Sequence, residues 1–190
     1  ALQKAEKMKK QAFADRYPYG IFSCIRTMGH IYKSRGNFDL SAQYYQEALD
    51  YMLKNMPDQD PSQLYSSLAE YYRNTQKDYA TALDYCEKAL KSAKTERNIA
   101  QAMIEKCLIL FRQGRIDEFN DCYKEAVQMA DRCKLSASVS LLIAHISKNI
   151  LDKQYEQAHA HADQLSEEGL QQHAYIYECA KDCLLYTSDA

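Results

Sequence analysis

The sequence predicts an all-α protein made of helical hairpins stacked in a solenoid. Apolar residues recur three and four positions apart along almost the whole chain, which is the spacing of amphipathic helices. Gly or Asn interrupts this pattern at regular intervals, as expected where one helix ends and another begins. A marker position inside every second expected helix recurs after 36, 41, 37 and 39 residues, a period typical of helix-pair solenoids. This position holds Ala12, Ala48, Ala89, Ala126 and finally Leu165.

The composition fits an ordinary water-soluble globular chain. Of the 190 residues, 46% are hydrophobic and 26% are charged, and only 5 are Gly and 3 are Pro, which argues against a linker or a disordered segment. The formal net charge is −2, so no overall positive field favours nucleic acid or an anionic membrane. No run approaches the ~20 apolar residues that span a bilayer. We therefore expect no nucleic-acid binding and no membrane contact by this segment.

The two ends of the sequence indicate a fragment. It begins at Ala1 inside a helical pattern, with neither an initiator Met nor the zones of a signal peptide. Residues 183–190 read like the translation of a sequencing adapter, so they are excluded from the expected fold. We expect the natural sequence to be cut near Asp182 and any further domain to lie beyond it.

The cysteines lack the spacing of a zinc or redox motif. Outside residues 183–190 they are Cys24, Cys86, Cys107, Cys122, Cys133 and Cys179, and no two of them form Cys-x-x-Cys. Cys86, Cys107 and Cys122 fall on apolar faces of expected helices, so we interpret them as small buried hydrophobic residues. Thiols of this kind favour a reducing compartment.

The first complete hairpin has the clearest pattern. Its first apolar stripe is Ile25, Met28, Gly29 and Tyr32, its turn is Gly36-Asn37-Phe38, and its second stripe is Ala42, Tyr45, Ala48 and Leu49. Helices approach closely only where a small residue leaves room for a neighbouring aromatic, so we expect Gly29 opposite Tyr45. Gly36, and Gly114 in a later hairpin, are expected to end helices in the left-handed conformation, which penalises a Cβ.

A helix start is expected at the beginning of the second hairpin. The segment Asp60-Pro61-Ser62-Gln63 places a capping carboxylate before a proline in the first turn. Gln63 is expected to reach back to the cap, as in a capping box.

These residues resemble the tetratricopeptide repeat (TPR). The first copy matches at Gly29, Tyr32, Gly36, Phe38, Tyr45 and Ala48. The second matches at Ala69, Tyr72, Tyr79, Ala82, Cys86 and Ala89, with one residue inserted in its turn. The third matches at Cys107, Leu110, Gly114, Ile116, Tyr123 and Ala126, but carries Phe119 in place of a small residue. The resemblance implies a TPR-like right-handed helix-hairpin solenoid.

The resemblance also divides the chain. It predicts one array over residues 1–182, made of a half-repeat (1–18), repeat 1 (22–56), repeat 2 (61–95), repeat 3 (97–133), a degenerate repeat 4 (136–168) and the start of a fifth (170–182).

No group of residues has the spacing of a catalytic, cofactor or metal site. His159 and His161 are two positions apart, which points them in different directions on a helix. His145 has no carboxylate companion and is interpreted as solvated or at the edge of the core. There is no Gly-rich phosphate loop, nucleophile elbow or calcium loop. We therefore expect a non-catalytic fragment without cofactor or metal.

The first helix of each TPR pair commonly lines a groove that binds extended peptides, so the resemblance implies such a groove here. The candidate groove residues are Arg26, His30, Lys33, Glu70, Arg73, Asn74, Leu108, Phe111 and Arg112. The first two copies are polar with a positive bias and the third is apolar, which suits a protein or peptide with an acidic segment and a hydrophobic anchor. Solvated helix faces are the alternative interpretation. The Lys, Asn and Arg set with which chaperone-tail-binding TPRs clamp a carboxylate is not matched, because four of those places hold His30, Ser67, Gln101 and Glu105.

Two stretches are similar to the TPR region of bacterial sensor histidine kinases. They are residues 26–32 with 35–38, and residues 113–119. This resemblance implies a sensory or dimerising module of a larger signal-transduction protein, on the extracytoplasmic face of a membrane. The alternative is a self-standing cytoplasmic TPR adaptor or scaffold, and an all-helical enzyme is the third class. A homodimer is compatible with the first two.

Overall fold

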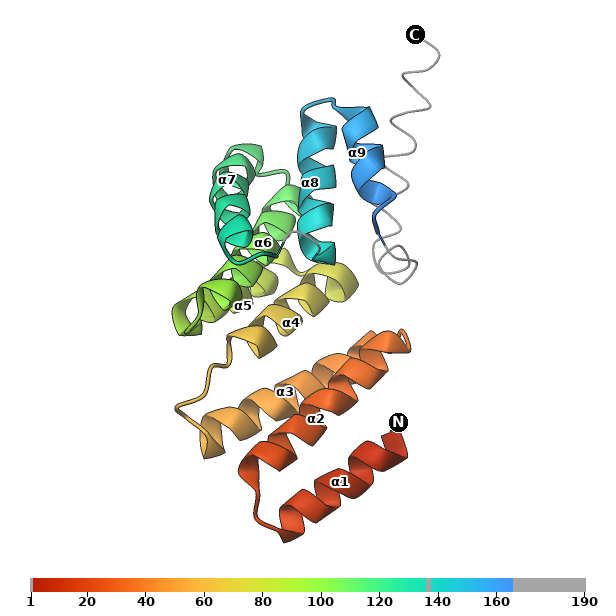
Figure 1. Cartoon of the computed structure of the whole chain (residues 1–190), viewed down its shortest axis with the longest axis vertical. Coiled ribbons are helices and arrows are strands. Elements are labelled where there is room, and N and C mark those ends of the chain that lie inside the picture. Colours follow the sequence, from red (N-terminus) through yellow and green to blue (C-terminus); the bar gives the residue numbers. More distant parts are fainter. Residues whose placement is uncertain (1, 136–137, 166–190) are drawn as a thin grey trace. The chain divides into compact units, whose positions relative to one another are not determined.

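The computed structural model describes residues 2–135 and 138–165, and all regular secondary structure in these ranges is helical (Figure 1). The prediction of an all-α helix-hairpin fold is confirmed. The expected start of a fifth repeat at residues 170–182 and the adapter-like residues 183–190 lie outside the described residues. The division into repeats stays a prediction.

The helices follow one another along the chain with short connections (Figure 1). They are α1 (Leu2–Ala14), α2 (Pro18–Ser34), α3 (Phe38–Asn55), α4 (Ser62–Tyr71) continued by the π-helical turn η1 (Tyr72–Gln76), α5 (Tyr79–Ser92), α6 (Glu96–Arg112), α7 (Ile116–Arg132), α8 (Val139–Leu151) and α9 (Tyr155–Ala162). The packed pairs include α2 with α3, α4 with α5, and α8 with α9. The chain forms two compact units, residues 1–102 and 103–190.

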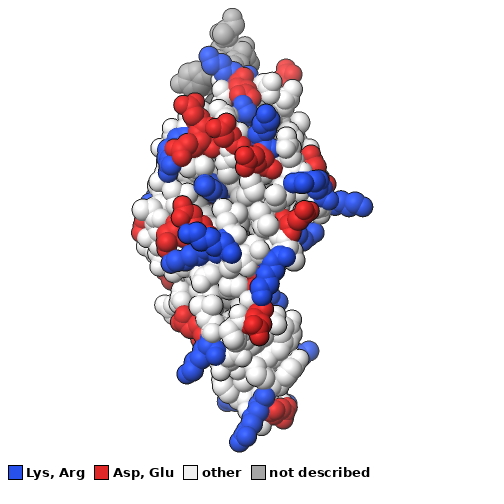
Figure 2. Space-filling model, turned by 90° about the vertical axis from the view of Figure 1, so that its left-hand side faces the viewer, with Lys and Arg blue, Asp and Glu red and all other residues white. Residues whose placement is uncertain are grey.

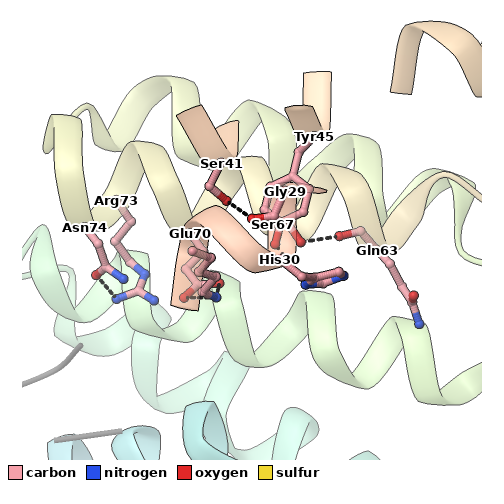
Figure 3. Close-up of polar contacts among 10 residues, drawn as sticks. Gly29, His30, Ser41, Tyr45, Gln63, Ser67, Glu70, Arg73 and Asn74 are labelled. Atoms are coloured by element: carbon pink, nitrogen blue, oxygen red, sulfur yellow. Dashed lines mark hydrogen bonds and ion pairs between the residues drawn. The ribbon is translucent and has the colours of Figure 1, made fainter. Parts of the chain in front are cut away.

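A close helix contact in the first unit joins α2 to α3. A Cβ added to Gly29 would lie 2.6 Å from Cε1 and 2.7 Å from Cδ1 of Tyr45, whose side chain is only 3% exposed. The Ser41 hydroxyl donates a hydrogen bond of 2.9 Å to the carbonyl of Gly29 (Figure 3). The prediction that Gly29 lies opposite Tyr45 is therefore confirmed.

Two turns have the predicted left-handed glycines. Gly36 has φ +73° and Gly114 has φ +68°, each after the end of a helix. Other turns adopt the same backbone region without glycine, at Arg16, Lys77, Lys134 and Lys153. These four turns could not be predicted from the sequence, because Lys and Arg side chains are not diagnostic of a positive φ.

The small residues at the repeat positions are buried. Ala48, Ala69, Ala82 and Ala89 are inaccessible to solvent, and Ala126 is 1% exposed. Tyr32 is half-buried, and its ring stacks on that of Tyr44 at 5.3 Å between centroids. Since larger side chains at these alanine positions would overpack the interior, the pattern of small residues has the expected steric role.

The start of α4 differs from the expectation. Asp60 accepts hydrogen bonds from the Ser62 backbone N–H at 2.9 Å, from the Lys94 backbone N–H at 2.8 Å and from the Asn98 side chain at 2.9 Å. Gln63 does not reach back to the cap, because its amide donates to Asn98 Oδ1 at 3.2 Å. Partial burial raises the pKa of Asp60, but these hydrogen bonds outweigh it and lower the pKa below its ordinary value. Asp60 therefore joins the start of α4 to the segment leading into α6.

The second unit has an aromatic core in place of one small residue. Phe119 on α7 is fully buried, and its ring lies 5.7 Å from the rings of both Phe111 and Tyr123, measured between centroids. Ile143 and Ile146 of α8 are also fully buried. Within the described residues, no helix combines the length and apolar character needed to cross a membrane.

Candidate functional site

The first polar stripe lies on α2. Arg26, His30 and Lys33 are four and three residues apart, which places them on one side of the helix. The helix begins at Pro18, whose fixed φ suits the first helical position. The Arg26 guanidinium lies over the Phe22 ring, 5.4 Å from its centroid, and its Nε is buried without a hydrogen-bond partner.

The second polar stripe lies on α4 and η1. Gln63, Ser67, Glu70 and Asn74 are spaced by four, three and four residues, again on one side of the helix. The Ser67 hydroxyl donates to the Gln63 carbonyl at 3.0 Å (Figure 3). Gln63 is exposed, and the other three are half-buried. We call the α2 and α4 stripes together the polar face.

An ion pair joins the two stripes. The Lys33 ammonium lies 2.6 Å from Glu70 Oε2 and 2.7 Å from its Oε1, with side chains 28% and 23% exposed. An ion pair with this exposure contributes at most about 1 kcal/mol to stability. It also neutralises Lys33, so the predicted positive bias is weaker than the residue types indicate.

Arg73 is a correction to the predicted groove. Its side chain is 2% exposed and donates a hydrogen bond of 2.7 Å to Asn74 Oδ1 (Figure 3). It belongs to η1, a π-helical turn that we interpret as accommodating the residue inserted in the second copy. Arg73 is therefore an interior polar residue rather than a cation open to a ligand.

His30 presents a neutral imidazole to the polar face. Burial lowers its pKa, the charges of Arg26 and Lys33 lower it further, and Glu70 opposes them. The Tyr45 hydroxyl lies 3.0 Å from His30 Nδ1. In the neutral tautomer that accepts this hydrogen bond, Nε2 carries the proton and can donate to a ligand.

Comparison with known protein families finds a match over the part of the chain that contains the polar face. Residues 21–95, which include most of α2 and all of α3, α4 and α5, match the family model of the tetratricopeptide repeat. These residues are tetratricopeptide repeats. The search of curated proteins found no match.

A solved structure is similar over almost the whole chain. BtubC (BKLC) from P. vanneervenii matches 99% of this chain and 88% of its own, with a TM-score of 0.64 and 18% sequence identity. At this identity the similarity establishes the fold alone. Together with the family match, it extends the TPR-like architecture beyond the repeats at residues 21–95.

The candidate residues from the third copy lie in the second unit. Leu108 is 1% exposed, so it is part of the interior, and its prediction as a groove residue that contacts a peptide is corrected. Phe111 and Arg112 are half-buried, and the ring of Phe111 packs against Phe119. The polar face consequently rests on the first two copies.

Sequence reasoning missed one extension of the polar face. Asn98 accepts from Gln63 and donates to Asp60, which makes the first turn of α6 part of the same polar network. No repeat position identifies Asn98, because its role depends on how α6 packs beside α4. Among residues 2–135 and 138–165, no cluster of His, Cys, Asp and Glu could hold a metal ion.

The second unit contains two stacked histidines. The Tyr123 hydroxyl lies 2.6 Å from His145 Nδ1, and the His145 and His161 rings stack at 5.1 Å between centroids. The Asn149 amide lies 3.0 Å from His161 Nδ1. Burial lowers the pKa of His145 and the neighbouring His161 lowers it further, while Asp131 opposes them.

We expect stability to fall on mild acidification. His145 has a folded-state pKa below the ordinary 6.5, so the unfolded chain binds more protons. The contribution of His145 to the free energy of unfolding is fully present above pH 6.5, its ordinary pKa, and is lost as the pH falls below that value towards the lower folded-state pKa. His30 acts in the same direction. The free energy of unfolding, measured in urea from pH 8 to pH 5, should show this loss, and His145→Gln should make it smaller. An unchanged slope in the variant would contradict the assignment.

Proposed function

We propose that the chain is a non-catalytic interaction module that binds an extended peptide along the polar face. Tetratricopeptide repeats are protein-interaction modules, and residues 21–95 indicate this general role. The side chains of the polar face indicate which kind of peptide would bind. On the side drawn in Figure 2, Lys and Arg alternate with Asp and Glu instead of forming one basic patch. Recognition therefore depends on a few local groups.

The observation that carries the proposal is the state of Arg26. Its guanidinium is held over Phe22, and its buried Nε lacks a hydrogen-bond partner. The Nε itself is out of reach of a ligand, but the Arg26 side chain as a whole is only half-buried, and a carboxylate is the acceptor that matches guanidinium geometry. His30, one turn further along α2, can add a hydrogen bond from Nε2 to the peptide backbone. The partner is therefore an acidic peptide segment.

A random peptide library displayed on phage tests this proposal. We expect selected peptides to be enriched in Asp and Glu, and Arg26→Ala to weaken their binding about tenfold or more, the loss typical of a charged hydrogen bond. Binding would be measured by calorimetry with synthetic peptides. The matched control is Lys54→Ala, which removes an exposed cation from α3, the second helix of the same hairpin. Equal affinity for Arg26→Ala and the unmodified chain would contradict the proposal.

The proposal also concerns the larger protein to which this module belongs. The stretches at residues 26–32 with 35–38, and at residues 113–119, support a sensory or dimerising region of a bacterial signal-transduction protein of the sensor histidine kinase type. That protein would carry this module on the extracytoplasmic face of a membrane. A self-standing cytoplasmic adaptor is the alternative. A longer read of the gene distinguishes them, because the first requires a membrane-spanning segment and a kinase core after this module.

A further inference from the structure

Two cysteines of the second unit lie side by side on adjacent helices. Cys107 on α6 and Cys122 on α7 have their sulfur atoms 3.0 Å apart, with the Cys107 thiol donating to Cys122. A disulfide bond is ~2.05 Å long, so the two sulfurs need to approach by only about 1 Å. Both residues are thiols in the structure. This pair could not be predicted from the sequence, because the two residues are not in a Cys-x-x-Cys spacing.

The two thiols differ in access to solvent. Cys107 is completely buried, while Cys122 is half-buried. The hydrogen bond from Cys107 lowers the pKa of Cys122, and Lys106 lowers it further, whereas burial and Glu125 oppose this. Cys122 is thus the more exposed thiol of the pair and the one whose pKa is lowered, so attack on an external disulfide would begin there, with Cys107 as the second thiol.

We propose that Cys107 and Cys122 form a reversible disulfide that links α6 to α7 on reaction with a low-molecular-weight disulfide such as oxidised glutathione. The Cys122 thiolate attacks one sulfur of the oxidant, forms a mixed disulfide and releases one glutathione thiolate. The Cys107 thiolate then attacks the Cys122 sulfur and releases the second. Two protein thiols are oxidised, one oxidised glutathione is reduced to two glutathiones, and these take up the two protons.

The expected product can be identified without a variant. Trypsin cleavage after Lys106, Arg112, Arg115 and Lys124 places the two cysteines in separate peptides, residues 107–112 and 116–124. The native 190-residue chain is incubated with oxidised glutathione, alkylated, digested and analysed by mass spectrometry. We expect the two peptides to be joined by a disulfide, with a loss of two hydrogen atoms and no attached glutathione. A thiol reductant should separate them.

Controls distinguish this pair from general thiol oxidation. Cys133 is half-buried like Cys122, so Cys133→Ser should leave the cross-link yield unchanged. Cys107→Ala should leave glutathione attached to Cys122, because the second step has lost its nucleophile. In guanidinium, where the fold is absent, the 107–122 pairing should lose its preference over other pairings. A native chain that keeps glutathione on Cys122, remains unreacted, or cross-links other cysteines preferentially would overturn the proposal.

Discussion

Replacing Gly29 by alanine should lower the free energy of unfolding by about 1 kcal/mol, and by no more than about 2 kcal/mol. The added Cβ would lie 2.6 Å from the ring of Tyr45, which is 3% exposed. That ring cannot move aside readily because its hydroxyl is hydrogen-bonded to His30 and its surroundings are closely packed. Overpacking of this kind costs about 1–3 kcal/mol, more than offsetting the ~1 kcal/mol by which alanine improves helix propensity. Urea unfolding followed by circular dichroism measures the change.

Gly20→Ala is the matched control in the same helix. A Cβ there would lie 2.5 Å from the Tyr17 ring, an equally short distance, but Tyr17 is 54% exposed and its ring can turn into solvent. We therefore expect a change within about 0.5 kcal/mol, of either sign. Equal destabilisation by the two substitutions would show that the rigidity of Tyr45 is not the cause. If the double variant Gly29→Ala/Tyr45→Leu loses less stability than the sum of the two single variants, the clash with the Tyr45 ring is directly supported as the cause.

Phe119→Ala should be the most destabilising of the substitutions considered, with a loss of about 3–5 kcal/mol. Phe119 is fully buried between the rings of Phe111 and Tyr123. Its truncation to alanine would create a cavity and would remove both aromatic contacts. A loss of this size lowers the Tm by roughly 10 °C in a chain of this length. Thermal unfolding monitored by circular dichroism measures it.

Phe13→Ala provides the control for that prediction. Phe13 on α1 is 52% exposed, so the same chemical change removes little buried area and should alter stability by less than about 1 kcal/mol. If Phe119→Ala were as mild as Phe13→Ala, the aromatic core of the second unit would not be what holds α6 and α7 together. Phe119→Leu should fall between the two because it fills part of the cavity.

Much of the fold was predictable because it depends on local and periodic signals. The apolar spacing identified the helices, and the small residues marked the close contact between Gly29 and Tyr45. Gly36 and Gly114 marked two turns, since a positive φ favours glycine. The non-glycine turns were missed because Lys and Arg carry no such preference.

The candidate site was predictable only in part. The resemblance to the tetratricopeptide repeat implied that Arg26, His30 and Lys33 share one side of a helix, and all three lie on α2 at spacings of four and three residues. Residue types alone could not show that Lys33 pairs with Glu70, because that contact spans 37 positions of sequence. They also could not show that Arg73 is buried, since this follows from the packing around a π-helical turn. The positive groove expected from the sequence is therefore reduced chiefly to Arg26.

The sequence by itself determined the helix-hairpin architecture and the positions where small residues are required, because both are set by periodicity and by steric limits that act within a repeat. Only the tertiary structure decided which charges are neutralised, which candidate residues are buried and which thiols meet. Those outcomes depend on contacts between helices far apart in the chain. Cys107 and Cys122 have ordinary positions in the sequence, yet packing of α6 against α7 brings their sulfurs to 3.0 Å.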